Sequence, residues 1–171
     1  MPVQHKEIID KIIEREGGDK FTMDPLDLGG ATKFGITQRT LSDFLGRGVP
    51  VVEVKELRRE VAEEIYESLY ITRPRFFKIS NAQLKELIID CGVNHGVGVA
   101  ARWLQKALGV DQDGIIGPQT LEALDKVNQY SLIGKICSYR IKFYTRIVMR
   151  DMSQIKFLAG WINRATQFLE A

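Results

Sequence analysis

Hydrophobic residues recur every three or four positions along most of the chain, which is the spacing of amphipathic α-helices. The first such segment begins near Gln4 and should end at Gly17 and Gly18, because glycines suit a left-handed helix C-cap. Glu16 therefore lies on the last turn of this helix. The apolar face of the helix consists of Ile8, Ile9, Ile12 and Ile13.

Further periodic segments predict more helices downstream. One should follow an N-cap at Thr37 and another should cover about 55–71, with Thr72, Arg73 and Pro74 ending it. A capping box at Ser80 and Gln83 predicts the start of the next helix, and Gly109 should end the helix that contains Trp103. Pro118 has the position of an N1 proline at the start of a further helix. Two more helices should cover about 131–150 and 157–170. The pattern predicts a mainly α-helical fold of about eight helices.

One stretch interrupts this helical pattern. Residues 19–36 contain short polar and apolar pieces broken by Pro25 and by Gly29 and Gly30, which is typical of a small β-hairpin or an irregular loop. The stretch also brings the aspartates Asp19, Asp24 and Asp27 close in sequence to Glu16.

Composition narrows the class of protein. A chain of 171 residues with 44% hydrophobic and 27% charged residues fits a globular domain or two small lobes. The net charge of +2 is too small for the concentrated basic surface of a nucleic-acid binder.

No run of apolar residues is as long as the core of a signal peptide or a membrane span, so we expect a protein made without a Sec signal. We expect Cys91 and Cys137 to be buried thiols rather than a disulfide.

The acids of the interruption are candidates for general acid chemistry. Glu16 faces the negative end of the helix dipole, which disfavours its ionised form. Asp24 and Asp27 lie on a turn that can fold back over that helix end, and paired carboxylates across a cleft are the equipment of glycoside hydrolysis. The alternative is that Glu16 is a solvated charge and that the aspartates only form turns, Asp24 before Pro25 especially.

Several motifs in one order resemble the glycoside hydrolase family 108 muramidases, which include phage endolysins and secretion-activator lysozymes. They are E-G-G at 16–18, D-P-L-D-L-G-G-A-T-K-F-G-I-T at 24–37 and C-G-V-N-H-G at 91–96. The segment from L-Q-K-A-L-G-V at 104–110 through D-G-I-I-G-P at 113–118 is similar to the peptidoglycan-binding region of that family.

The resemblance implies a lysozyme-like helical fold and a set of site residues. Glu16 takes the position of the catalytic acid, and Asp24 and Thr32 take positions that would assist water or the oxocarbenium ion. Asp27 is the second candidate aspartate. Family members often carry an aromatic residue directly after E-G-G, whereas Asp19 and Lys20 precede Phe21 here, so which aspartate assists Glu16 stays open.

Phe21, Asn94 and His95 are the candidate substrate-binding residues. For His95 a helix-capping or packing role is the alternative, since histidine serves either purpose. Trp103 and Trp161 are expected in the core. The candidates for stacking on sugar rings are Tyr130, Tyr139 and Tyr144. The basic residues of the penultimate helix are expected on its solvated face, namely Arg140, Lys142, Arg146 and Arg150.

The function that follows is that of an N-acetylmuramidase, which cleaves the β-1,4 bond between N-acetylmuramic acid and N-acetylglucosamine. The alternative is a non-catalytic peptidoglycan-binding or secretion-accessory protein. We expect no metal and no cofactor, a monomer, and action on the cell wall after release. Residues 1–93 should form the catalytic region, and residues 94–171 a helical peptidoglycan-binding region packed on it or part of one compact unit.

Overall fold

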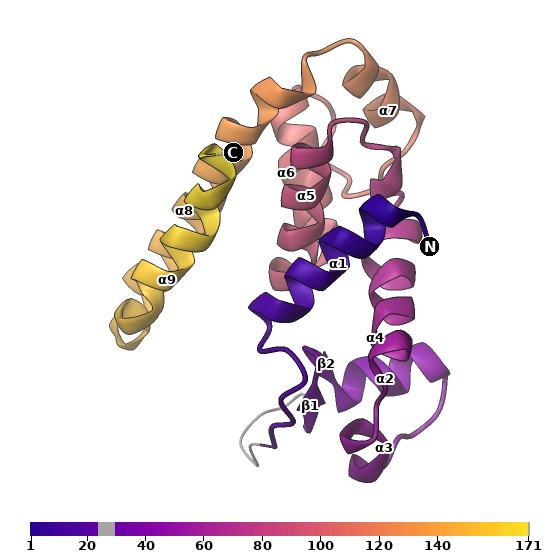
Figure 1. The fold of residues 1–171 in the computed structure, drawn as a ribbon. Coiled ribbons are helices and arrows are strands. Elements are labelled where there is room, and N and C mark those ends of the chain that lie inside the picture. Colours follow the sequence, from indigo (N-terminus) through magenta and orange to yellow (C-terminus); the bar gives the residue numbers. More distant parts are fainter. Residues whose placement is uncertain (24–29, 171) are drawn as a thin grey trace. The chain divides into compact units, whose positions relative to one another are not determined.

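A computed structural model describes residues 1–23 and 30–170 of the chain. The described part is mainly helical, with nine α-helices and one small two-stranded sheet, which confirms the predicted fold class (Figure 1). Two compact units account for the fold, Met1–Arg73 and Pro74–Ala171. The predicted functional boundary after residue 93 stays a prediction.

The first unit is built around helix α1. It contains α1 (Val3–Arg15), β1 (Thr32–Lys33), β2 (Ile36–Thr37), α2 (Gln38–Leu45), α3 (Val51–Lys55), α4 (Arg59–Tyr66) and the π-helical segment η1 (Glu67–Thr72). The four isoleucines of the predicted apolar face of α1 are at most 3% exposed. They pack α1 against α4 and η1, so the periodic pattern located this core correctly.

The end of α1 is fixed by its two glycines. Gly17 and Gly18 have φ angles of 99° and 65°, in the left-handed region that side chains disfavour. The N–H of Gly18 donates to Ile13 O at 2.9 Å and that of Gly17 to Glu14 O at 3.2 Å, which is the Schellman arrangement. The predicted C-cap is confirmed, and Glu16 is the capping residue.

The predicted hairpin is present at the end of the interruption. β1 and β2 pair antiparallel, with Thr32 opposite Thr37 and Lys33 opposite Ile36. Phe34 and Gly35 form the connecting turn with φ angles of 54° and 74°. Two left-handed residues are the requirement of a type I′ turn, which matches the twist of the strands.

One predicted helix starts later in the structure than the sequence pattern indicates. The helix predicted over about 55–71 starts at Arg59 with α4 and continues into η1, which ends at Thr72, whereas Lys55 is the last residue of the separate helix α3. Arg58 is extended at φ −85° and ψ 150°, and Leu57 in the linker is buried. Leu57 therefore contributes to the apolar spacing without being helical, which is why the pattern predicted an earlier start of the helix.

The described part of the second unit contains five α-helices, four of which pack as two pairs. Its α-helices are α5 (Ala82–His95), α6 (Val97–Leu108), α7 (Pro118–Asp125), α8 (Leu132–Arg150) and α9 (Ile155–Thr166). The short segments between and after them are η2 (Phe76–Lys78), η3 (Gln129–Ser131), η4 (Met152–Gln154) and η5 (Gln167–Leu169). α5 packs on α6 and α8, and α8 runs alongside α9 (Figure 1).

Most helix caps in this unit follow the sequence, but one is shifted. Pro118 begins α7 and the left-handed Gly109 follows α6, as predicted. The N-cap of α5 is Asn81 and not Ser80, because Asn81 Oδ1 accepts the Leu84 N–H at 2.8 Å. The N–H groups of Ser80 and Asn81 both donate to Gln129 Oε1, at 3.1 and 3.0 Å. The predicted capping box is therefore wrong by one residue.

Both cysteines are free and buried, as predicted. Burial raises the pKa of the Cys91 thiol to about 12 and that of Cys137 to about 11. Neither thiol is therefore a reactive thiolate near neutral pH.

Within residues 1–23 and 30–170, the helices are all too short or too polar to span a bilayer.

Candidate active site

The side chain of Glu16 packs against the turn of the β-hairpin. A Cβ atom placed on Gly35 would lie 2.7 Å from Glu16 Cβ and 3.0 Å from Glu16 Cγ. Glycine therefore permits the turn to approach the helix end this closely. The Schellman motif holds the backbone of Glu16, and the hairpin holds its side chain, which is half-buried.

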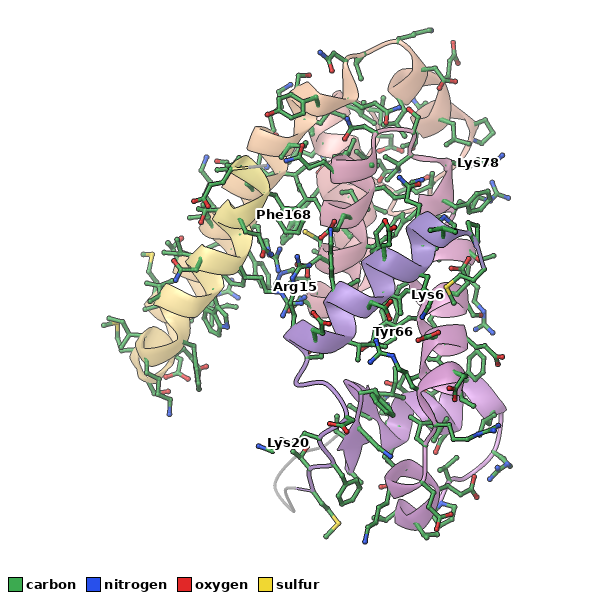
Figure 2. The ribbon with its side chains drawn as sticks, in the orientation of Figure 1. Lys6, Arg15, Lys20, Tyr66, Lys78 and Phe168 are labelled. Atoms are coloured by element: carbon green, nitrogen blue, oxygen red, sulfur yellow. The ribbon has the colours of Figure 1, made fainter. Side chains whose placement is uncertain are left out.

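Two tyrosines from α4 and η1 complete this arrangement. The side chain of Tyr66, which Figure 2 labels, donates its hydroxyl hydrogen to Phe34 O at 3.0 Å, and its hydroxyl oxygen lies 2.5 Å from the same Cβ position on Gly35. The rings of Tyr66 and Tyr70 are 5.6 Å apart. Burial and then the negative charge of Glu16 raise the pKa of Tyr70, so this phenol stays protonated and able to donate a hydrogen bond.

The turn that meets Glu16 is conformationally strained. A residue with a side chain rarely adopts the φ of Phe34, and such positions persist where the surroundings enforce them. Here the Phe34 ring is buried at 6% exposure, and its carbonyl accepts the Tyr66 bond. Strain of this kind is concentrated at functional sites. A carboxyl group beside a rigid turn and protonated phenols has the equipment for acid catalysis on a polar substrate.

The other predicted residues of the first unit fall into two groups. Thr32 is on β1, and its hydroxyl donates to Gly30 O at 3.5 Å. Its backbone pairs with Thr22, next to the half-buried Phe21. The structure therefore places Thr32 and Phe21 on the hairpin region that carries Gly35. Asp24 and Asp27 lie outside the described residues.

Tyr66 and Tyr70 were not recognised from the sequence. Their spacing of four residues on a predicted helix places both on one face. That spacing was available, but the aliphatic pattern of the same segment masked it.

Among the described residues, no cluster of three or more His, Cys, Asp or Glu side chains could hold a metal ion.

We expect Gly35→Ala to lower both stability and activity, because Gly35 is left-handed and its new Cβ would overlap Glu16 and Tyr66. The left-handed conformation alone costs about 1–2 kcal/mol. Gly46→Ala is the control, since Gly46 has φ 67° and nothing within 4 Å of its Cβ position. Urea unfolding should show about this loss of stability in Gly46→Ala and a larger loss in Gly35→Ala. Peptidoglycan clearing should fall roughly tenfold or more only in Gly35→Ala. Equal activity of the two variants would contradict the contact.

In the second unit, Asn94 and His95 end helix α5. The Asn94 amide donates to Asp90 O at 2.8 Å, and the side chain is otherwise exposed. His95 Nε2 lies 3.2 Å from the Tyr144 hydroxyl, and its ring contacts the rings of Trp103, Phe143 and Tyr144. Packing is therefore part of the role of His95, and its proposed role in substrate binding stays a prediction.

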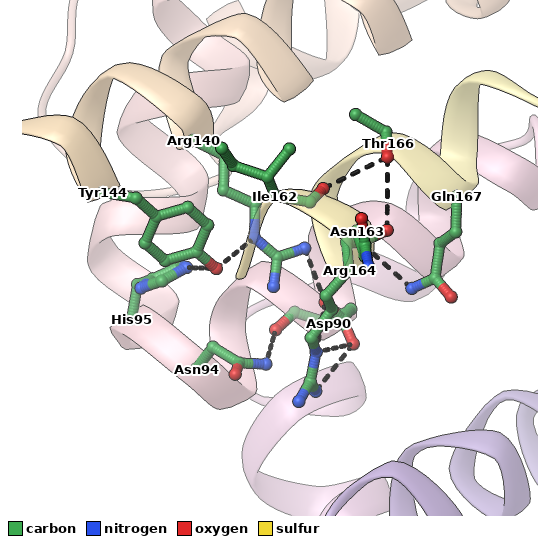
Figure 3. Close-up of polar contacts among 10 residues, drawn as sticks. All are labelled: Asp90, Asn94, His95, Arg140, Tyr144, Ile162, Asn163, Arg164, Thr166 and Gln167. Atoms are coloured by element: carbon green, nitrogen blue, oxygen red, sulfur yellow. Dashed lines mark hydrogen bonds and ion pairs between the residues drawn. The ribbon is translucent and has the colours of Figure 1, made fainter. Parts of the chain in front are cut away.

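Beside this pair lies a buried ionic network (Figure 3). Arg140 Nη1 is 2.7 Å from Asp90 Oδ2, and both side chains are fully buried. Arg164 adds hydrogen bonds to the same carboxylate, the shortest at 2.9 Å. Burial by itself would raise the pKa of Asp90, but the two arginines lower it below its ordinary value. The prediction of a solvated Arg140 is wrong, because a partner 50 positions away holds it inside the unit.

The pKa of the His95 ring depends on its burial and on the charge of Arg140, so measuring this pKa tests the structure around the network. Burial and then the positive charge of Arg140 lower the pKa of His95 to about 4, with smaller effects of Asp90 and Arg164. The unfolded chain binds the same proton near pH 6.5, so protonation favours unfolding. We expect this contribution to stability to fall as pH drops from about 6.5 to about 4. An NMR titration of the ring protons, assigned with His95→Gln, checks this; a midpoint near 6.5 would contradict it.

Comparison with known proteins identifies the family. The family described as Glycosyl hydrolase 108 matches residues 9–96, just over half of the chain, and this match includes Glu16 and the hairpin. The chain belongs to the glycosyl hydrolase 108 family. The resemblance seen in the sequence motifs is thereby confirmed. A second family, described as a predicted peptidoglycan domain, matches residues 99–166.

A solved structure supports the same assignment. The structure of Brucella abortus SagA is similar over 96% of this chain and 90% of its own, with 32% sequence identity and a TM-score of 0.80. None of the curated proteins matches this chain. The glycosyl hydrolase match ends directly after Asn94 and His95, and the peptidoglycan match begins three residues later.

Proposed function

We propose that this glycosyl hydrolase 108 protein is an N-acetylmuramidase, cleaving the β-1,4 bond between N-acetylmuramic acid and N-acetylglucosamine in peptidoglycan. The observation that carries the proposal is the placement of Glu16. The helix end fixes the backbone of Glu16, its side chain packs against the strained turn, and the Tyr66 phenol bonds to that same turn. Fixed geometry and access to a proton are what a general acid needs.

In this mechanism Glu16 donates its proton to the glycosidic oxygen as the bond between that oxygen and the anomeric carbon breaks. Asp24 or Asp27 assists the attacking water or the oxocarbenium ion, and Thr32 supports that step. Phe21 contacts the sugar from the hairpin region. The chemistry requires no metal and no organic cofactor. The protein would act as a monomer on the cell wall after release from the cytoplasm.

A second candidate function is non-catalytic binding to peptidoglycan, which the separate match to a predicted peptidoglycan domain favours. The two are distinguished by incubating the protein with purified peptidoglycan. A hydrolase clears the suspension and releases new reducing ends. A binding protein pellets with the wall and releases none. New free amino groups without reducing ends would indicate cleavage of amide bonds and overturn the glycosidase proposal.

A further inference from the structure

The second unit contains a pocket of about 430 Å³ that the proposed chemistry of Glu16 does not use. Three helices line it: α5 at its C-terminal end, α8 near its middle and α9. The lining residues are Asn94, His95, Phe143, Tyr144, Ile147 and Trp161. The volume is within the range of small-molecule sites. The pocket draws on both matched regions of the sequence, because Asn94 and His95 belong to the first and the others to the second.

Aromatic rings form a packed wall in this pocket. Trp161 stacks on Tyr144 with ring centres 5.2 Å apart and an angle of 22° between the planes. Phe143 meets His95 edge-on at 5.1 Å. These contacts fix the rings before any ligand binds, which reduces the entropy lost on binding. Trp161 and Trp103 are both half-buried rather than enclosed, so the expectation that they are core residues is only partly met.

The Tyr144 hydroxyl contacts both Arg140 and His95 (Figure 3). Arg140 Nε can only donate, so the Tyr144 oxygen accepts that bond at 2.8 Å. The phenol keeps its own hydrogen, which can be donated to His95 Nε2 at 3.2 Å. In the tautomer that accepts this bond, neutral His95 carries its hydrogen on Nδ1, and no described residue accepts a bond from that N–H. The lowered pKa of His95 keeps the ring in this neutral form near pH 7.

Asn94 supplies the complementary group. Its amide nitrogen is engaged with Asp90 O, which orients the side chain and leaves Oδ1 as an acceptor at the exposed end of the helix. The pocket therefore presents one donor and one acceptor beside an aromatic wall. None of the six lining side chains is charged when His95 is neutral.

We propose that this pocket binds an N-acetylated hexose unit of the glycan strand. Such a sugar offers an apolar ring face for Trp161, an acetamide oxygen to accept from His95 and an N–H or hydroxyl to donate to Asn94. The peptide stems of peptidoglycan carry carboxylates, for which the lining has no cation. The inference deepens the proposed wall-directed function by naming a ligand and residues on the second unit, and it does not depend on catalysis by Glu16.

Intrinsic fluorescence tests the proposal, because Trp103 and Trp161 are the chain's two tryptophans and both lie in the second unit. Trp103→Phe leaves Trp161 as the reporter, and Glu16→Gln in the same chain prevents turnover. We titrate this protein with the β-1,4-linked tetramer of N-acetylglucosamine. The expected result is a saturable change in Trp161 emission, with a Kd at or below roughly the millimolar range. No change at higher concentrations overturns the proposal.

Two substitutions on this reporter chain assign the response to the pocket. Asn94→Ala removes the acceptor at an exposed position and should weaken binding about tenfold, the effect of one hydrogen bond. Asn163→Ala truncates an exposed asparagine of α9 that does not line the pocket and should bind as the parent does. Circular dichroism confirms that both fold. Equal affinities in the two variants would overturn the site.

The outcomes separate this inference from the proposed function. A response to a free stem peptide but not to the sugar tetramer would overturn the ligand assignment. A wild-type protein that cleaves peptidoglycan but shows no sugar response at Trp161 would sink the second-unit site alone. Sugar binding at Trp161 in a protein that does not cleave peptidoglycan would support the site and contradict the hydrolase proposal.

Discussion

Glu16→Gln is expected to lower peptidoglycan cleavage by at least ~10²-fold, which is the lower range for loss of a general acid. Glutamine keeps the length and shape of the side chain, so the packing of Cβ and Cγ against Gly35 is retained. What is lost is the dissociable proton. Initial rates of clearing on purified peptidoglycan measure the effect, and circular dichroism checks that the variant remains helical.

Glu14→Gln is the matched control, because Glu14 is an exposed acid two residues earlier on the same helix. It removes the same charge near the same helix end without touching the hairpin. We expect its activity to be close to that of the wild type. A Glu16→Gln protein that clears peptidoglycan as fast as Glu14→Gln would rule out Glu16 as the proton donor.

The largest expected loss of stability comes from Asp90→Asn. The carboxylate is the ionic partner of the fully buried Arg140, whose charge would be left without compensation. Breaking a buried pair in this way costs about 3–5 kcal/mol. Urea unfolding followed by tryptophan fluorescence measures it directly, because both tryptophans are in the unit that contains the pair.

Glu122→Gln provides the control for this experiment. Glu122 pairs with Lys126 at 2.6 Å, but both side chains are 69% exposed. Exposed pairs of this kind contribute about 0–1 kcal/mol. Adding Arg140→Met to Asp90→Asn removes both buried charges and should recover part of the lost stability, since apolar replacements of buried pairs are often tolerated. A loss in Asp90→Asn no larger than in Glu122→Gln would contradict the network as the source of stability.

Features that depend on neighbours in the sequence were predictable. Gly17 and Gly18 indicate a helix end because a left-handed C-cap requires residues without side-chain clashes. Thr37 indicates a helix start because its hydroxyl reaches the Thr40 N–H, at 3.1 Å in the structure. The position of Glu16 follows directly from the first of these, so its location on the helix end could be predicted from the sequence alone.

Features that depend on distant partners were not predictable. Arg140 reads as one member of a basic helix face, and only the folded second unit brings Asp90 to it. Tyr66 reads as part of an apolar segment, and its bond to Phe34 O needs the hairpin turn to be in place. The contribution of Asp24 or Asp27 stays a prediction, because both lie outside the described residues.

The central claim is that Glu16 drives cleavage of one particular glycosidic bond. The most direct measurement is mass spectrometry of borohydride-reduced fragments from purified peptidoglycan, treated in parallel with the wild type and with Glu16→Gln. We predict fragments ending in reduced N-acetylmuramic acid with the wild type, and at least ~10²-fold less of them with the variant. Fragments ending in reduced N-acetylglucosamine, fragments with cleaved amide bonds, or equal yields from the two proteins would contradict the account.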